Sequence, residues 1–152
     1  LQYSACIGLQ EVVLFRSARV EKSYFSSPLL SPDKIKEQLW MGAEQGKRTD
    51  LPTVKVVGSW HEWLEQCSKE LPLLAFHPDS AENFAHLPRS ASQQPLNLVI
   101  GPEGGLLDGE VETLKRLPAK VLELGPQLLR TETAVVAAFS QLQLHRMLHN
   151  SG

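Results

Sequence analysis

The clearest strand signal in this 152-residue chain is Leu96-Asn97-Leu98-Val99-Ile100-Gly101-Pro102. An apolar run that ends at a Gly-Pro step is typical of a buried strand followed by a tight turn. The same pattern recurs in Lys120-Val121-Leu122-Glu123-Leu124-Gly125-Pro126. Helical patterns follow both stretches, so the two stretches predict strands of an α/β fold.

Upstream of these two strands, predicted strands and helices alternate in the same way. Short apolar runs predict further strands at 11–15, 53–57 and 73–76. A first helix is predicted at 32–45, where Ser31 and Pro32 mark its start and Gly46 its end. A second is predicted at about 60–70, after a capping box formed by Ser59 and Glu62. Two more are predicted at 108–117, with Asp108 as N-cap, and at about 131–148. The pattern therefore predicts a parallel sheet of about five or six strands with helices on both faces.

Length and composition restrict the class of protein. With 42% hydrophobic and 21% charged residues, the chain fits one globular domain and not a disordered or coiled-coil protein. It has no apolar run near the roughly 20 residues of a membrane span and no signal-like N-terminus, so we expect a cytoplasmic protein without membrane contact. Its net charge of −2 means that any contact with RNA is local or shared with another chain.

The cysteines and histidines do not predict a metal site. Cys6 and Cys67 lie far apart without a CxxC spacing, and we expect both to be small core residues. His145 and His149 have the i, i+4 spacing of metal ligands, but no third ligand accompanies them, so we interpret them as exposed helix residues. His77 attracts more interest than the remaining histidines because it follows a predicted strand.

Two loops could carry chemistry, because ligands of parallel sheets bind beyond the carboxyl ends of the strands. Residues 100–106, Ile-Gly-Pro-Glu-Gly-Gly-Leu, have glycines that let a ligand approach the backbone, although an ordinary tight turn explains them equally well. In residues 124–134, a cap by Thr131 or Thr133 and the helix dipole beside Glu132 explain most of the polar side chains, but not Arg130. We expect the two loops to lie side by side.

Two motifs resemble the signature of the bacterial 16S ribosomal RNA (uracil-N3)-methyltransferase family, which belongs to the SPOUT superfamily. They are IGPEGGLLDGEV (100–111) and LGPQLLRTETA (124–134), and they occur in this order along the chain. Residues 43–52 resemble its AEQ-x-x-R-x-x-x-P element, and residues 15–19 resemble its loop after the first strand. The chain departs from the family pattern at Gln127, where Arg is usual, and at Gly46, where a small polar residue or Cys is usual. The chain lacks the Gly-x-Gly-x-x-Gly, Walker and Gly-x-Ser-x-Gly motifs of other enzyme classes.

The resemblance implies a C-terminal trefoil knot that binds S-adenosylmethionine, and a homodimer. It also implies that residues 1–152 form the SPOUT-like catalytic domain, without the N-terminal RNA-binding β-barrel of the family. The cofactor-binding residues carried over from the family are Ile100, Gly101, Gly104, Gly105, Leu124, Gly125, Leu129 and Arg130. The apolar helix at 131–148 fits a dimer independently.

Methyl transfer to uracil N3 requires that its proton leave and that the negative charge be stabilised. Arg130 suits the second task, and Glu103 or Glu132 suits the first. For 16S ribosomal RNA, the predicted contacts are Arg16, Arg19, Lys47 and Arg48, with a solvated surface as the alternative reading. Two other functions stay open: a non-catalytic RNA-binding or scaffolding module, and a methyltransferase that acts on a ribose 2′-hydroxyl of transfer RNA.

Overall fold

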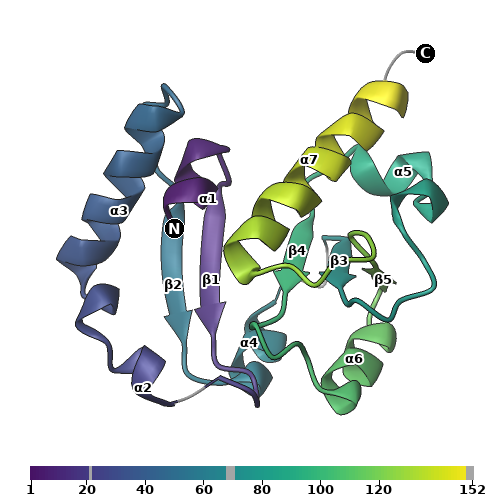
Figure 1. Cartoon of the computed structure of the whole chain (residues 1–152), viewed down its shortest axis with the longest axis horizontal. Coiled ribbons are helices and arrows are strands. Elements are labelled where there is room, and N and C mark those ends of the chain that lie inside the picture. Colours follow the sequence, from purple (N-terminus) through teal and green to yellow (C-terminus); the bar gives the residue numbers. More distant parts are fainter. Residues whose placement is uncertain (21, 68–70, 150–152) are drawn as a thin grey trace. The chain divides into compact units, whose positions relative to one another are not determined.

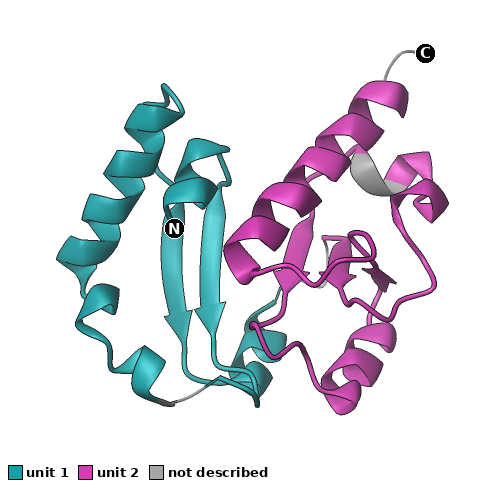
Figure 2. Ribbon diagram, viewed as in Figure 1, with its two compact units in different colours: residues 1–67 teal, residues 68–152 magenta. Residues whose placement is uncertain are grey.

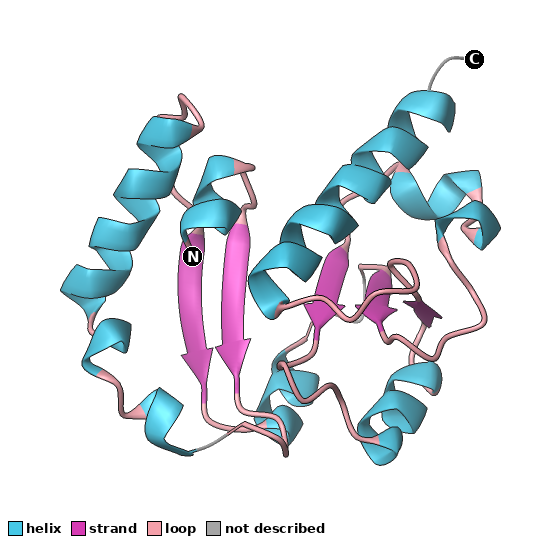
Figure 3. Ribbon diagram, viewed as in Figure 1, coloured by secondary structure: helices cyan, strands magenta, loops and turns pink. Residues whose placement is uncertain are grey.

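The computed structural model describes residues 1–20, 22–67 and 71–149, and the chain divides into two compact units. Unit 1 comprises residues 1–67 and unit 2 comprises residues 68–152 (Figure 2). Helices and strands alternate within each unit (Figure 3), which confirms the predicted α/β class. No helix within the described ranges is long and apolar enough to cross a membrane.

Unit 1 is built on two parallel strands. Its elements are α1 (Gln2–Cys6), β1 (Glu11–Phe15), α2 (Lys22–Phe25), the 3-10 helix η1 (Pro28–Leu30), α3 (Pro32–Gln45), β2 (Thr53–Val57) and α4 (Trp60–Gln66) (Figure 1). The strands pair in register from Glu11 opposite Thr53 to Phe15 opposite Val57. Both strands and α3 have the predicted bounds, whereas α4 ends at Gln66, and residues 68–70 of its predicted range lie outside the described residues.

Gly42 in α3 and Gly46, the residue just after that helix, allow α1 to pack closely against it. A Cβ atom added to Gly42 would lie 2.1 Å from the carbonyl oxygen of Gln2, and one added to Gly46 would lie 2.4 Å from that of Cys6. Any side chain at these positions would force the two helices apart. The close contact therefore favours glycine at both positions in this chain.

An aromatic cluster joins α4 to the end of β1. The ring of Phe15 stacks on Trp63 with centroids 4.6 Å apart, and Trp60 lies 5.1 Å from Trp63. The predicted capping of α4 is confirmed in part: the Ser59 hydroxyl accepts a hydrogen bond from the Glu62 N–H (3.1 Å). The Glu62 carboxylate accepts one from the N–H of Gly58 (3.0 Å), one residue before the position that a capping box requires.

Unit 2 contains a three-stranded parallel sheet. Its elements are β3 (Leu73–Phe76), the 3-10 helix η2 (Phe84–His86), α5 (Arg89–Ser92), β4 (Asn97–Ile100), α6 (Asp108–Lys115), β5 (Ala119–Leu122) and α7 (Thr131–His149). The strand order is β4-β3-β5, so the first strand of the unit lies between the two later ones. Asp108 begins α6 and does not cap it as predicted; Leu107 precedes the helix, and its N–H donates to the Glu110 carboxylate (2.8 Å).

Alternate residues of this sheet face different helices. Leu74, Phe76 and Leu122 join Ala138 and Leu142 of α7 in the main core of the unit. Val121 faces the other way, where it lines a pocket together with residues of α6. Helices thus cover both faces of the sheet, as the near-continuous apolar strands predicted.

The prediction of one sheet with five or six strands is wrong. The five strands of the described residues pair as a two-stranded sheet, β1-β2, and a separate three-stranded sheet, β4-β3-β5. Apolar runs indicate where strands form, but strand pairing depends on contacts between residues far apart in the sequence. Periodicity alone therefore cannot fix the number of sheets.

Candidate functional site

The loop after β5 is held by the last helix. It runs from Glu123 to Arg130, and the side-chain amide of Gln141 on α7 donates a hydrogen bond to the carbonyl oxygen of Leu124 (2.9 Å). Gly125 follows with φ +133°, a conformation that residues with a Cβ rarely adopt. Sequence reasoning predicted the glycine, but it did not identify Gln141.

The loop after β4 folds into a tight turn. The N–H of Gly105 donates to the carbonyl of Pro102 (2.7 Å), and Gly105 has φ +74°. A Cβ atom at Gly101 would lie 3.1 Å from the side chain of Leu106, so the turn packs against its own start. This geometry agrees with the tight turn that was one interpretation of the sequence, and the turn still leaves Glu103 and Gly104 exposed.

The two loops meet although their strands do not. β4 and β5 lie on opposite sides of β3, but the hydroxyl of Thr131 donates to the carbonyl of Gly101 (3.3 Å). The chain beyond β5 therefore reaches the loop beyond β4. The predicted cap by Thr131 or Thr133 is wrong: the residue before α7 is Arg130, whose carbonyl accepts from the N–H of Ala134 (2.8 Å), and the Thr131 hydroxyl is directed to Gly101.

The three predicted catalytic side chains lie on or beside these loops. Arg130 and Glu132 flank the first residue of α7, and Glu103 lies in the turn that includes Gly104. All three side chains are exposed, and among the described residues none of them forms an ion pair. They are therefore accessible to a substrate.

The backbone of the two loops fits a bound S-adenosylmethionine. A Cβ atom at Gly125 would meet only the Gln127 side chain, at 3.8 Å, so the backbone there can be approached closely. Among the predicted cofactor residues, the partly buried ones are Ile100, Gly101, Gly105, Leu124 and Leu129. Peptide groups of this kind can hold an adenosine without an acidic ribose-binding residue.

The four basic residues predicted to bind RNA are divided into two pairs. Arg16 and Arg19 follow the carboxyl end of β1, whereas Lys47 and Arg48 precede the amino end of β2, and the two strands are parallel. Arg48 forms an ion pair with Asp50 (2.6 Å), and its guanidinium packs against Gly8. That ion pair lowers the pKa of the Asp50 carboxyl, because the Arg48 hydrogen bond favours its ionised form.

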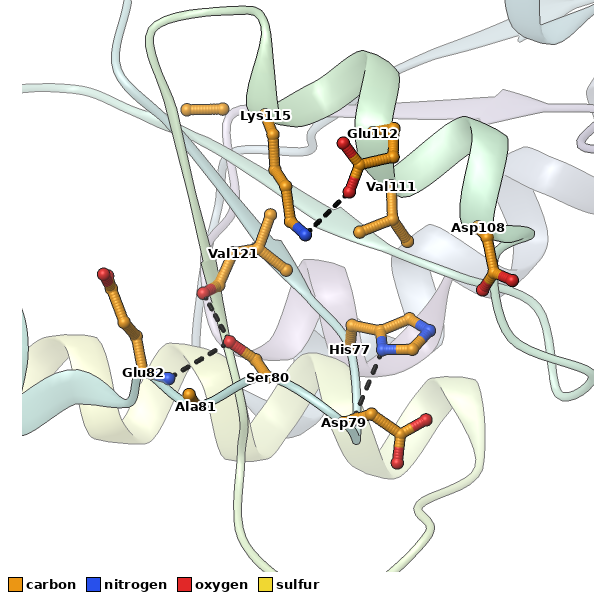
Figure 4. Close-up of a pocket in the computed structure, with 11 residues that line it drawn as sticks. His77, Asp79, Ser80, Ala81, Glu82, Asp108, Val111, Glu112, Lys115 and Val121 are labelled. Carbon is orange, nitrogen blue, oxygen red and sulfur yellow. Dashed lines mark hydrogen bonds and ion pairs between the residues drawn. The ribbon is translucent and has the colours of Figure 1, made fainter.

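A third loop at the same edge of the sheet was missed by sequence reasoning. Residues 77–82 follow β3, and three hydrogen bonds hold them beside β5: His77 N–H to Leu122 O (3.0 Å), Ser80 Oγ to Val121 O (2.7 Å) and Glu123 N–H to Glu82 O (2.7 Å). This loop and α6 line a pocket of about 580 Å³ (Figure 4), in which Lys115 pairs with Glu112 (2.8 Å). None of the predicted cofactor residues lines that pocket. The only advance signal was the position of His77 after a strand.

The histidines of α7 are not both exposed, as the sequence had led us to expect. His145 is buried, and its Nε2–H donates to the carbonyl of Leu87 (2.9 Å). The His149 ring packs edge-on against it, with centroids 4.4 Å apart. Burial, together with the charges of His145 and Arg89, lowers the pKa of His149. Among the described residues, no three His, Cys, Asp or Glu side chains are grouped to hold a metal ion.

Neither cysteine is fully buried, which corrects the expectation that both belong to the core. Cys6 and Cys67 are half-buried and are not joined by a disulfide, and burial raises the pKa of the Cys67 thiol. A raised pKa keeps that thiol protonated and poorly nucleophilic at neutral pH.

Comparisons with known proteins find a matching family model and named relatives. A family model described as "RNA methyltransferase domain" matches residues 1–143. Ribosomal RNA small subunit methyltransferase E 1 of Borreliella burgdorferi is 28% identical over 137 residues, which cover 88% of this chain and 56% of that protein. Ribosomal RNA small subunit methyltransferase E of Bacillus subtilis is 32% identical over 123 residues, which cover 72% of this chain and 47% of that protein.

Solved structures show the same fold. A protein from Legionella pneumophila in complex with the cofactor SAM has a TM-score of 0.73 and 27% identity, and the match covers 94% of this chain and 58% of that one. Ribosomal RNA small subunit methyltransferase E of Neisseria gonorrhoeae, bound to S-adenosyl methionine, has a TM-score of 0.75 and 24% identity, with the same coverage. The chain thus spans about half to three fifths of the relatives it matches. Because the family model matches nearly its whole length, the chain belongs to the RNA methyltransferase domain family.

Proposed function

We propose that this chain transfers a methyl group from S-adenosylmethionine to N3 of a uracil in 16S ribosomal RNA. The observation that carries the proposal is the hydrogen bond from Thr131 to Gly101, because it brings together the two loops whose sequences carry the family signature. The names of the relatives, which are ribosomal RNA small subunit methyltransferases, support the class of substrate.

The protein's main contribution to the reaction is positioning. S-adenosylmethionine, when bound, supplies an electrophilic methyl group on a sulfonium. The peptide groups of Gly101, Gly104 and Gly105 and of Leu124 and Gly125 would hold the adenosine and direct that methyl group towards the RNA. Fixed geometry of the reacting atoms can supply much of a rate enhancement, since it removes the entropy cost of their encounter.

The reaction forms an N–C bond at uracil N3, breaks the S–C bond of the sulfonium and releases the N3 proton. We assign acceptance of that proton to Glu103, with Glu132 as the weaker candidate. Glu132 lies in the first turn of α7, where the helix dipole favours a negative charge. Arg130 would stabilise the negative charge that spreads to O2 and O4 as the proton leaves.

The basic residues suggest how the RNA backbone is contacted. Arg16 and Arg19 lie together in the loop after β1, and we assign them to one phosphate-binding patch. Lys47 and Arg48 lie at the other end of the strand pair, so they would contact a different part of the RNA. Charge reversal at Arg19 should therefore lower both the affinity for RNA and its salt dependence, and an unchanged salt dependence would discard this patch.

The assembly that we propose is a homodimer in which unit 2 carries a trefoil knot. The last two turns of α7 expose Leu144, Met147 and Leu148 by 56%, 70% and 67%, which is unusual for a helix that faces only water. The crossing from β5 back to the loop after β4 is the connection that would form the knot.

Calorimetry with S-adenosylmethionine is the first test. Measurable binding is expected, and its absence from the folded chain would instead favour a scaffolding module. The second test is methylation of small ribosomal subunits, naked 16S RNA and transfer RNA, with identification of the product nucleoside. Formation of 3-methyluridine supports the proposal, whereas a 2′-O-methylated nucleoside in transfer RNA would replace it.

Substitution of Arg130 by Ala should abolish transfer while cofactor binding largely survives. Arg116→Ala, on an exposed residue after α6, is the matched control and should retain full activity. If Arg130→Ala instead removes cofactor binding from a folded protein, Arg130 belongs to the cofactor site and not to the catalytic step.

A further inference from the structure

Gln141 lies in the middle of α7 and is directed at the loop after β5. Its side chain is partly buried, and its Nε2 donates a 2.9 Å hydrogen bond to the carbonyl oxygen of Leu124. Leu124 itself packs against the main core of unit 2. The amide thus links a helix anchored in the core to a loop with no strand partner beyond Leu122.

The hydrogen bond fixes more than one atom. The carbonyl of Leu124 and the N–H of Gly125 belong to the same planar peptide group and point in opposite directions. Because Gln141 holds the carbonyl towards α7, the Gly125 N–H must point away from α7. Gly125 has a φ of +133°, and a Cβ atom there would meet only the Gln127 side chain, at 3.8 Å.

We propose that Gln141 is a positioning residue for the methyl donor. It acts through the Leu124–Gly125 peptide, whose N–H it aims at the bound S-adenosylmethionine, and it does not itself touch the cofactor. This inference rests on the proposed function. It adds a residue outside both signature segments, 100–111 and 124–134.

The same helix also holds the other loop. At its first residue, Thr131 donates to the carbonyl of Gly101, so side chains ten residues apart on α7 fix one carbonyl in each loop. The Gly101 carbonyl precedes a proline, which has no N–H, so that contact orients no donor. Of the two contacts, only that of Gln141 sets the direction of a peptide N–H.

The test compares the affinity of three variants of the 152-residue chain for S-adenosylmethionine, with S-adenosylhomocysteine as a second probe. Gln141→Leu keeps the size and helix propensity of the residue but removes the donor. Loss of one such hydrogen bond should weaken binding about 3- to 10-fold. Gln143→Leu makes the same chemical change on another face of α7, since residues i and i+2 do not share a face. This control should bind like the unchanged chain.

Gln141→Glu provides a readout that a merely structural role would not give. Its ionised carboxylate can only accept a hydrogen bond and repels the Leu124 carbonyl, whereas its protonated form can donate. The affinity of this variant should therefore recover as pH falls from 8 towards the ordinary pKa of a glutamate carboxyl, about 4.3, relative to the unchanged chain at each pH. Thermal unfolding of every variant, without ligand, separates loss of affinity from loss of fold.

The outcomes separate the inference from the function on which it rests. If the unchanged chain binds neither probe, the proposed function fails. If the unchanged chain binds but Gln141→Leu binds equally well, or if Gln143→Leu weakens binding to the same extent, the positioning role of Gln141 is wrong. A pH-independent affinity of Gln141→Glu, relative to the unchanged chain, would overturn it as well.

Discussion

Substituting Gly42 with Ala tests the close packing of α1 on α3. The added Cβ would lie 2.1 Å from the Gln2 carbonyl oxygen, 2.8 Å from its carbon and 2.9 Å from its Cα. All three are backbone atoms, so no side-chain rotation can relieve the contact, and α1 must move by about 0.9 Å to restore a 3.0 Å separation. That movement would disturb Ser4 and Ala5, which are 6% and 0% exposed.

The expected loss follows from two opposing effects. Overpacking that forces a backbone shift costs up to about 3 kcal/mol. Alanine in place of glycine inside a helix returns about 1 kcal/mol. The net loss of unfolding free energy should therefore be about 2 kcal/mol, which lowers a urea midpoint by about 2 M for an m-value near 1 kcal/mol/M.

Tryptophan fluorescence is the appropriate assay. The three tryptophans of the chain, at positions 40, 60 and 63, all lie in unit 1, so their emission during urea denaturation follows the unit that contains Gly42. Gly109→Ala is the control, because a Cβ there meets nothing within 4 Å; measured by circular dichroism, it should not destabilise the protein. If Gly42→Ala is as stable as the unchanged chain, α1 does not pack on α3 as described.

Three further predictions concern unit 2. Leu74→Ala, at a position 1% exposed on the central strand, should cost about 2–5 kcal/mol of unfolding free energy, measured by circular dichroism; a loss below 1 kcal/mol would contradict the core assignment. Because the folded state lowers the pKa of His149 below its unfolded value near 6.5, the unfolded chain binds more protons there. The stability that neutral His149 contributes should be present above pH 6.5 and lost as pH falls through the folded pKa. The variant His149→Gln should therefore show a flatter dependence of unfolding free energy on pH, and an unchanged dependence would refute this. Leu148→Glu should shift sedimentation equilibrium towards monomer, and an unaltered dimer would exclude the end of α7 from the interface.

Local signals in the sequence predicted the five strands and the helices α3, α4, α6 and α7, but not the short helices α2, η1, η2 and α5. The bounds of α3 follow from Pro32 at the start and Gly46 just past the end, and β3 follows from a short apolar run between Pro72 and Pro78. Such signals act over a few residues, so one sequence contains all the information needed to recognise them. The roles of the loop glycines and of Arg130 came from the family resemblance of residues 100–111 and 124–134, and they remain predictions.

Contacts between distant residues could not be predicted. Thr131 looked like a helix cap, but its hydroxyl donates to Gly101, 30 residues earlier. His145 looked exposed because its acceptor, the Leu87 carbonyl, lies 58 residues away in the sequence. The separation of the strands into two sheets, and the contacts that hold the loop at 77–82 beside β5, were missed for the same reason.

The order β4-β3-β5 has a consequence for how the nascent chain folds. β3 is synthesised first, all four of its residues are buried, and both of its edges pair with strands that are made later. Until residue 122 has emerged, at least one edge of an entirely apolar strand has no neighbour, which favours association with other chains. Pairing that depends on such late partners is slow, so this half of the protein should depend on chaperones more than the first half does.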